Sequence, residues 1–349
     1  MPRLSVILST YEKPDELRLA LESLRRAATL GVTPFELVIA DDGSGPETGK
    51  VIENFAKNVS FDVVHVRHDD EGFRLAKIRN AAIRKSTGDV LFFVDGDSLV
   101  VPEALRAHSE QCEPGTACAG TRFFLGERQT ANVLGDAATM DDVLDLARRS
   151  GRWARRKLFV MNAVYRHTRL KTRPKLIGGN CSVHRSDLER INGFDERFIG
   201  WGREDDDLAR RLRRSGVRVR DVCLDCLVVH LHHPPHPSHQ PSVHHTPNYA
   251  YFHRDYFLAR CVHGLETRRL EDVTFDLPGE FPVELAPLRE KLGRPRSGEW
   301  AEVLVLPPGP DILQAVHGQF EAVIQLPRSV LESDSDPVTA SLHHLSSSL

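Results

Sequence analysis

Short apolar runs alternate with amphipathic segments through the first part of the chain. Residues 90–94 (VLFFV) are apolar without a break, which is typical of a strand buried on both faces. Residues 14–24 instead begin with a proline and place leucines at helical spacing. Similar patterns predict strands at residues 4–9, 35–40 and 61–66 and helices at residues 50–56 and 75–85. This alternation predicts an α/β fold with a doubly wound, mostly parallel central sheet flanked by helices.

The pattern changes twice further along the chain. Residues 126–175 are polar and arginine-rich, which indicates a mobile helical insertion within one large domain over residues 1–263. A small α/β appendage is expected over residues 264–328, with strands at 272–277, 301–306 and 322–326 and helices at 284–292 and 311–320. The serine-rich residues 329–349 are expected to form a disordered tail.

Composition narrows the class of protein. The net charge of −3 over 349 residues argues against nucleic acid as a partner. No apolar run approaches the roughly 20 residues needed to cross a bilayer. The N-terminus, Met1-Pro2-Arg3, enters a strand directly, without the pattern of a signal peptide. A cytoplasmic protein is therefore expected, with a peripheral place at the inner face of the membrane left open.

An acid pair follows the apolar run at residues 90–94. Asp95 and Asp97 are separated only by Gly96, at the strand end where open α/β sheets bind ligands. Two such carboxylates suit Mn²⁺ or Mg²⁺ bridging to a diphosphate. The alternative is an ordinary loop acid and Asx turn. The same sheet edge should collect the residues that follow the first two strands, namely Thr10, Tyr11, Glu12 and Asp42.

No glycine-rich phosphate cradle follows the first strand. The sequence has neither G-x-G-x-x-G there nor G-x-x-x-x-G-K-[ST], which excludes a dinucleotide-binding Rossmann domain and a P-loop. Diphosphate charge must then be met by a cation and by basic side chains. Arg74, Lys77 and Arg79 are the candidates, with a solvated helix face as the alternative for each.

A second set of candidates lies in residues 176–207. Gly178 and Gly179 let backbone approach a ligand closely before Asn180. Four acids, residues 204–207, begin a helix after Gly200-Trp201-Gly202. The helix dipole favours acids there, which is the purely structural explanation. A carboxylate beside an aromatic platform could instead deprotonate a sugar hydroxyl.

Histidines follow the strand expected at residues 227–230. Along an extended chain His230 and His232 point to the same side, which makes them a candidate metal pair. The later histidines of this loop, His233 among them, are expected to be exposed.

Taken in order, these motifs resemble a known family. S-V-I-L-S-T-Y at residues 5–11, A-D-D-G-S at 40–44, R-L-A-K-I-R-N at 74–80 and D-G-D at 95–97 resemble the GT-A glycosyltransferases of family 2. G-F-D at 193–195, G-W-G-R-E-D-D-D at 200–207 and H-L-H at 230–232 are similar to β-1,4-galactosyltransferases and chondroitin-polymerase-type transferases.

The resemblance implies a role for each motif. It divides the large domain into a nucleotide-sugar half, residues 1–125, and an acceptor and catalytic half, residues 176–263. It implies an inverting transfer from a UDP-sugar to a saccharide or glycoconjugate acceptor, with membrane-associated assembly machinery as a further partner. The implied donor-binding residues are Thr10, Tyr11, Glu12, Asp42, Arg74, Lys77, Arg79, Asn80, Asp95 and Gly96. The implied acceptor-binding residues are Gly179, Asn180, Trp201, Gly202 and Asp206. Asp97, His230 and His232 would bind Mn²⁺, and Asp205 would be the base with Glu204 beside it.

Three other interpretations remain open from the sequence. A nucleotidyltransferase would need a glycine- and arginine-rich loop after the first strand, and residues 9–14 offer none. A catalytically silent sugar-nucleotide or glycan-binding protein would keep the same fold. A zinc protein could be built on Cys223-x-x-Cys226 and the histidines. Six cysteines in a chain of this length do not indicate a disulfide scaffold.

Overall fold

The computed structural model describes the chain in two compact units, Met1–Phe252 and His253–Leu349. The residues described are 3–31, 33–168, 173–234, 246–254, 258–269, 272–277, 285, 287–292, 303–306, 322–331 and 336–348. The expected boundary at residue 263 is corrected to Phe252. The reason is packing, since Leu258 already belongs to the hydrophobic core of the second unit, with Val303 and Leu345.

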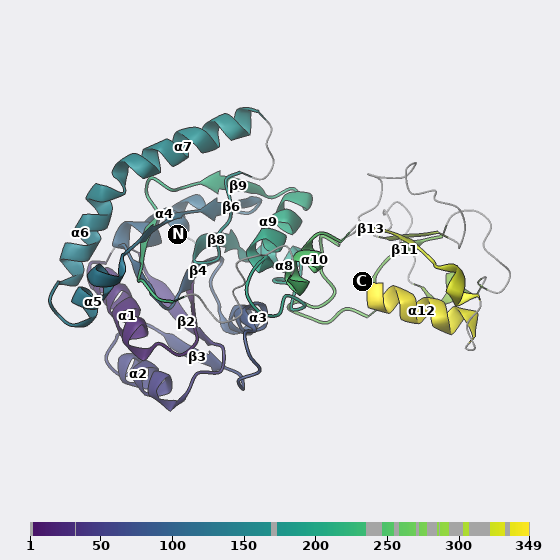
Figure 1. Ribbon diagram of the computed structural model, residues 1–349, viewed down its shortest axis with the longest axis horizontal. Coiled ribbons are helices and arrows are strands. Elements are labelled where there is room, and N and C mark those ends of the chain that lie inside the picture. The colour runs from purple at the N-terminus through teal and green to yellow at the C-terminus, as the bar shows by residue number, and fades with distance from the viewer. Residues whose placement is uncertain are drawn as a thin grey trace. The chain divides into compact units, whose positions relative to one another are not determined.

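Four parallel strands form one side of the main sheet of the first unit, in the order β3-β2-β1-β4 (Figure 1). Their helical connections place every carboxyl end on one edge of the sheet. The strands are β1 (Leu4–Thr10), β2 (Phe35–Asp41), β3 (Val63–Arg67) and β4 (Val90–Asp95). The helices between them are α1 (Pro14–Thr29), α2 (Pro46–Ala56) and α3 (Leu75–Lys85). The predicted mostly parallel α/β sheet is confirmed, with β1 and β4 buried along their apolar lengths.

The other side of the main sheet is mixed. Strand β8 (Asn180–His184) runs antiparallel to β4 and to β6 (Thr116–Ala119), and β9 (Arg218–Asp221) pairs parallel with β6. A second, three-stranded sheet joins β5 (Ser98–Val100), β10 (Leu227–His230) and β7 (Thr121–Phe124).

Residues 116–124 form two strands, β6 and β7, rather than one. The strand is interrupted at Gly120, where a Cβ atom would collide with the Asn180 side chain. Asn180 there accounts for the break, because its amide donates to the Thr121 and Cys226 carbonyls at 2.6 and 3.1 Å. The break moves β7 into the small sheet beside β10.

The insertion predicted over residues 126–175 contains three helices within residues 127–167, which agrees with the expected helical character. Thr139 begins one of its helices with a capping box, because its hydroxyl accepts from the Asp142 amide while the Asp142 carboxylate accepts from Thr139. The remaining helices of the first unit are α4 (Pro102–Gln111), α5 (Glu127–Leu134), α6 (Met140–Ser150), α7 (Arg152–His167), α8 (Arg185–Arg190), α9 (Glu204–Arg214) and α10 (Pro247–Phe252).

The second unit has its own small parallel sheet, in the order β11-β12-β13. Its elements are β11 (Phe275–Asp276), α11 (Leu288–Lys291), β12 (Val303–Leu306), β13 (Ala322–Gln325), the 3₁₀ helix η4 (Arg328–Val330) and α12 (Pro337–Ser348). The predicted appendage strands are thus found, whereas the helix predicted at residues 311–320 lies outside the described residues.

The expected disordered tail is wrong. Residues 337–348 form α12, because Val338 and Leu345 lie on one face and bury into the core of the second unit. Across both units, every helix in the described ranges is too short or too polar to span a bilayer.

Candidate active site

A cavity of about 670 Å³ opens at the carboxyl ends of β1 and β4. Both halves of the first unit contribute to it, since loops after β1 and β4 face the start of α9 and the end of β10. The expected site residues that line it are Thr10, Tyr11, Asp42, Arg79, Asp95, Gly96, Asp97, Gly179, Trp201, Gly202, Glu204, Asp205, Asp206 and His230. Segments far apart in the sequence thus meet around one hollow.

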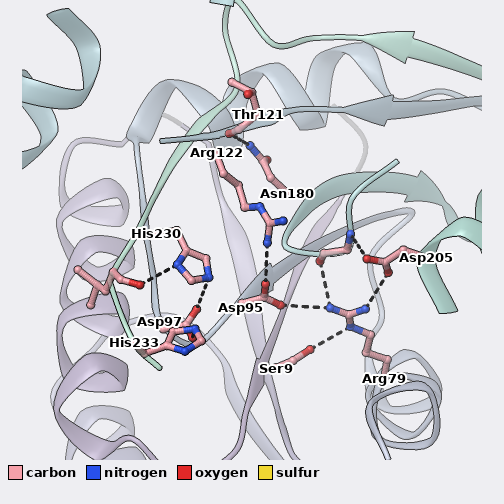
Figure 2. Close-up of polar contacts among 12 residues, drawn as sticks. Ser9, Arg79, Asp95, Asp97, Thr121, Arg122, Asn180, Asp205, His230 and His233 are labelled. Carbon is pink, nitrogen blue, oxygen red and sulfur yellow. Dashed lines mark hydrogen bonds and ion pairs between the residues drawn. The ribbon is translucent and has the colours of Figure 1, made fainter. Parts of the chain in front are cut away.

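One wall carries an aspartate–histidine cluster, which we define as Asp97, His230 and His233 (Figure 2). The Asp97 Oδ1 atom lies 3.4 Å from His230 Nε2, and its Oδ2 atom lies 3.1 Å from His233 Nε2. Lys13 donates to the same Oδ2 at 3.0 Å. Burial alone would raise the pKa of Asp97. The hydrogen bond to His233 and the positive charges of His230 and Lys13 outweigh burial and hold the pKa well below its ordinary value.

The hydrogen bonds of both imidazoles prepare them to bind a cation. His230 Nδ1 lies 2.7 Å from the Leu231 carbonyl, and His233 Nδ1 lies 2.7 Å from the Pro234 carbonyl. A carbonyl only accepts hydrogen bonds, so the Nδ1 atom of each imidazole carries the hydrogen. Each Nε2 atom faces an Asp97 oxygen, so a favourable contact needs a proton or a metal ion between them. Among the described residues Asp97 Oδ1 has no hydrogen-bond partner. One carboxylate and two imidazoles fit Mn²⁺ better than Mg²⁺, which prefers oxygen ligands throughout.

The role of metal ligand expected for His232 is corrected. Its side chain is exposed, and its backbone N–H donates to Thr130 Oγ1 at 2.8 Å, so His233 takes the place expected for it. The same-side argument assumed an extended chain through residue 232. Strand β10 ends at His230, and the His232 N–H bonds to the Thr130 side chain rather than to a neighbouring strand, so strand alternation no longer places His232 beside His230.

The opposite wall is organised by Arg79, which is 1% exposed. Its guanidinium donates to Asp95 Oδ1 at 3.2 Å, to Asp205 Oδ1 at 3.1 Å and to the Gly178 carbonyl at 3.2 Å (Figure 2). Its Nε donates to Ser9 Oγ at 3.1 Å. We call Arg79, Asp95, Asp205 and Gly178 the arginine cluster. It joins β4 of the first half to α9 of the second.

Gly178 is required at its position by close approach. Its N–H donates to Asp205 Oδ2 at 2.7 Å, and a Cβ atom there would collide with the Asp205 carboxylate and the Arg79 guanidinium. A Cβ on the neighbouring Gly179 would collide with Asp95. The two glycines therefore let the chain pass between the carboxylates.

The two acids that begin α9, Glu204 and Asp205, are partly buried, and both hold protons more tightly than usual. Burial raises the pKa of Asp205, although Arg79 and the Gly178 N–H oppose the shift. Burial and the charge of Asp205 raise the pKa of Glu204 to about 8. Glu204 Oε2 has no hydrogen-bond partner within the described chain. The helix dipole therefore does not dominate here, and Asp205 is a stronger base than a surface aspartate.

The rest of the acid run serves other purposes. Asp207 points inward and pairs with Arg211 at 2.6 Å, which holds α9 against the core. Asp206 pairs with Arg203 at 2.9 Å at the cavity, beside Trp201 and Gly202.

The remaining wall is formed by the ends of β1 and β2. Asp42 is 3% exposed, accepts from the Arg74 N–H at 2.8 Å and lies 2.6 Å from His68 Nε2. Burial raises its pKa despite both contacts. The Tyr11 hydroxyl donates to Asp70 at 3.1 Å. These contacts fix Asp42 and Tyr11 at the cavity.

Two expected ligand contacts are corrected because the side-chain amides are occupied within the fold. Asn80 bonds to the Phe194 backbone at both its amide oxygen and nitrogen, at 2.9 and 2.8 Å. Asn180 closes the Gly120 break and lies 2.9 Å from His108. Both side chains are fully buried.

Three expected donor-binding side chains also lie outside the cavity lining. Glu12 accepts from the Gly45 N–H at 2.9 Å and braces the loop after β1. Lys77 pairs with Glu71 at 2.8 Å, and Arg74 Nε donates to the Glu71 carbonyl at 3.3 Å. A solvated helix face, the alternative stated for Arg74 and Lys77, describes them better.

Lys13, Arg122 and His233 line the cavity and were missed as site residues. Arg122 lies 3.5 Å from Asp95 Oδ2 and 5.3 Å above the Phe124 ring. A basic residue beside the loop after the first strand could have signalled Lys13. Nothing in the sequence around Arg122 marks it, because the break at Gly120 brings it to the site.

Among the described residues, the Cys223-x-x-Cys226 pair forms no metal site with the histidines. Both thiols are buried, with Cys223 Sγ near the Arg155 carbonyl and Cys226 Sγ near the Ala104 carbonyl, at 3.7 and 3.9 Å. Burial raises the pKa of both thiols. In the described part of the chain the metal-ligating group is the aspartate–histidine cluster instead.

Two family models match this chain. Residues 5–191 match glycosyl transferase family 2, and residues 160–237 match the model described as the N-terminal domain of galactosyltransferase. The second match contains the α9 acids and the histidines of the cluster. Together the two models cover both walls of the cavity.

Curated relatives include a glucosyltransferase and two synthases. Validoxylamine A glucosyltransferase of Streptomyces hygroscopicus is 30% identical over 62% of this chain and 53% of its own length. Chondroitin synthase of Escherichia coli is 25% identical over 63% of this chain and 33% of its own length. Hyaluronan synthase of Pasteurella multocida is 25% identical over 66% of this chain and 25% of its own length. The chain thus spans about half, or less, of these relatives.

Proposed function

This chain belongs to glycosyl transferase family 2 and is a glycosyltransferase of GT-A fold, and from that premise we propose its reaction. It is an inverting, divalent-cation-dependent enzyme that moves a hexose or N-acetylhexosamine from a UDP-sugar to a saccharide or glycoconjugate acceptor, forming a β-glycosidic bond. One observation carries the proposal: the aspartate–histidine cluster and Asp205 line the same cavity.

The donor nucleotide occupies the wall formed by Thr10, Tyr11 and Asp42. Asp42 is fixed by His68 and the Arg74 N–H, and its carboxylate keeps lone pairs for a uracil N–H or a ribose hydroxyl. Asp95 and Gly96 continue this wall toward the cluster. Lys13 lies 3.0 Å from Asp97 and Arg122 lies 3.5 Å from Asp95, and these two basic side chains attract the diphosphate.

Asp97, His230 and His233 would hold the cation, with Mn²⁺ preferred over Mg²⁺ for its tolerance of imidazole. When bound, the cation offsets the negative charge that develops on the UDP leaving group. His233 holds its proton more tightly than an ordinary histidine because it hydrogen-bonds to Asp97, which raises its pKa. Cation binding therefore releases protons from the cluster.

Asp205 takes the proton of the acceptor hydroxyl. The acceptor oxygen forms a bond to the anomeric carbon while the bond from that carbon to the UDP oxygen breaks, which inverts the configuration. Arg79 and the Gly178 N–H hold both oxygens of Asp205, so its position is fixed before the acceptor arrives. Trp201, Gly202 and Asp206 line the acceptor side, and Gly179 lets the chain pass close to Asp95.

The acceptor class is proposed only as a saccharide or glycoconjugate. The relatives' names range from validoxylamine A to chondroitin and hyaluronan. A cytoplasmic location and membrane-associated assembly partners stay predictions of the sequence.

Release of UDP from candidate UDP-sugars, with Mn²⁺ and a panel of saccharide acceptors, tests the reaction. We expect Asp205→Asn to lower kcat by roughly 10²–10⁴ while UDP and Mn²⁺ still bind, because only the proton acceptor is lost. Asp206→Asn is the neighbouring comparison, and it should raise the KM for acceptor more than it lowers kcat. Full turnover by Asp205→Asn, or donor binding confined to other nucleotides, would overturn the proposal.

A further inference from the structure

Helix α7 presents apolar side chains to solvent. Trp153, Val160 and Val164 are 78%, 60% and 55% exposed, and Met161 beside them is 36% exposed. The spacing from residue 153 to 160 and 164 is seven and eleven residues, so these side chains form one stripe along the helix. Arg156 and Lys157 lie between Trp153 and Val160 on this side of the helix, so exposed apolar and basic side chains share one face. Such a face on a surface helix indicates an interaction site.

The other face of α7 is tied to the first unit. Arg155 donates to the Ala147 and Arg148 carbonyls at 3.3 and 3.2 Å, and Asn162 donates to Asp221 at 2.6 Å. These contacts fix the orientation of the helix, so its apolar stripe faces solvent. In Figure 1, α7 forms an outer edge of the first unit, beyond β9.

The polar positions beside the stripe are basic. The 16 residues of α7 contain five arginines and lysines and neither aspartate nor glutamate. Arg152, Arg156 and Lys157 are exposed. The chain as a whole carries a net charge of −3, so this helix is a local exception. Its charge is complementary to an anionic surface.

We propose that the outer face of α7 binds an anionic lipid surface, a property beyond the glycosyl transfer itself. Trp153 would lie at the headgroup level, Val160 and Val164 would enter the acyl boundary, and Arg156 and Lys157 would contact lipid phosphates. A helix with an apolar stripe, a tryptophan and flanking basic residues is suited to lie in a membrane interface. Each arginine or lysine close to an anionic leaflet strengthens binding by about fivefold.

Other occupants match this face less well. A second copy of the chain would bring the same basic residues against each other, which opposes a symmetric contact. A saccharide is bound by polar groups and aromatic rings, whereas valines and a methionine dominate the stripe. A membrane satisfies the apolar stripe and the positive charge together.

Co-sedimentation of the full chain with vesicles tests the proposal. We expect binding to vesicles of mixed phosphatidylcholine and phosphatidylglycerol and much weaker binding to phosphatidylcholine alone. Trp153→Ser should weaken binding on the order of tenfold through lost apolar burial. The double variant Arg156→Gln/Lys157→Gln should weaken it by about 25-fold at low salt, and added salt should reduce the difference.

Two exposed residues on other helices serve as matched controls. Leu30 is 68% exposed at the end of α1, and Lys57 follows α2 with its side chain 66% exposed. Leu30→Ser and Lys57→Gln should leave vesicle binding unchanged, and melting curves should show that every variant folds. Equal binding to neutral vesicles, or α7 variants that bind like the wild type, would overturn the proposal. Absence of vesicle binding together with self-association that Trp153→Ser abolishes would assign the face to a second copy instead.

Discussion

Two aspartates on opposite walls of one cavity are held in opposite chemical states. Asp97 faces two imidazoles and an ammonium group, and these contacts keep its pKa low although it is largely buried. Asp205 is held by one guanidinium and one backbone N–H, and burial still raises its pKa. The same residue type therefore serves as a permanent anion in one place and as a proton acceptor in the other.

The partners of each aspartate explain the difference. Asp97 Oδ1 has no hydrogen bond in the described structure, whereas both oxygens of Asp205 accept one. The Asp97 Oδ1 atom faces the His230 imidazole without a hydrogen bond, so it can bind a cation. The Asp205 carboxylate accepts a hydrogen bond at each oxygen, so its position is fixed. Because Arg79 is shared by Asp205 and Asp95, the arginine cluster also ties the catalytic half to the donor half.

The largest effect should follow from removing the charge at the centre of the arginine cluster. Arg79→Met would leave the Asp95 and Asp205 carboxylates without their buried counter-ion. Breaking a buried ion pair in this way costs about 3–5 kcal/mol of stability. We expect the urea midpoint of the first unit's unfolding transition to fall accordingly, as followed by circular dichroism.

Lys77 provides the control from the same helix. Its ammonium pairs with Glu71 at the surface and is 39% exposed, so Lys77→Met should cost at most about 1 kcal/mol. Adding Asp205→Asn to Arg79→Met should recover part of the loss, since one uncompensated charge is removed. Equal destabilisation by Arg79→Met and Lys77→Met would show that the two walls are not joined through this arginine.

The next effect separates two histidines that are adjacent in sequence. His233→Ala should weaken Mn²⁺ binding by at least about tenfold, because it removes an imidazole nitrogen that faces Asp97. His232→Ala should leave it unchanged, because that side chain is exposed and only its backbone N–H is used. Isothermal titration with Mn²⁺ in the presence of UDP measures both. If His232→Ala weakened Mn²⁺ binding and His233→Ala did not, the His230/His232 pair predicted from the sequence would be the metal pair. The aspartate–histidine cluster would then be contradicted.

These two histidines show where sequence patterns stop being informative. Strand β4 could be predicted because its five consecutive apolar residues are typical of a strand buried on both faces, and the acid pair follows them directly. The choice between His232 and His233 depends on the contact of the His232 N–H with Thr130, 102 residues earlier in the chain. The positions of Asn80 and Asn180 depend on backbone partners more than 40 residues away. Contacts of that kind leave no local periodicity.

The last effect concerns the proton on Glu204, and its direction follows from linkage. The folded protein binds this proton more tightly than the unfolded chain, because burial and Asp205 raise the pKa from 4.5 to about 8. Glu204 therefore stabilises the fold fully below pH 4.5, and this contribution is lost as the pH rises to 8, by at most about 1.4 kcal/mol for each pH unit.

Glu204→Gln keeps the shape of the protonated acid and cannot ionise, so it should remove this pH dependence. The Tm of the variant minus that of the wild type should rise between pH 5 and pH 8 by several degrees and then level off. The kcat profile of Glu204→Gln should keep its acid limb, because the variant retains Asp205 as the base. A Tm difference that stays constant across this range would mean that Glu204 is ionised at neutral pH. Glu204 and Asp205 would then be ionised side by side, and the charge of Glu204 would raise the pKa of Asp205 further.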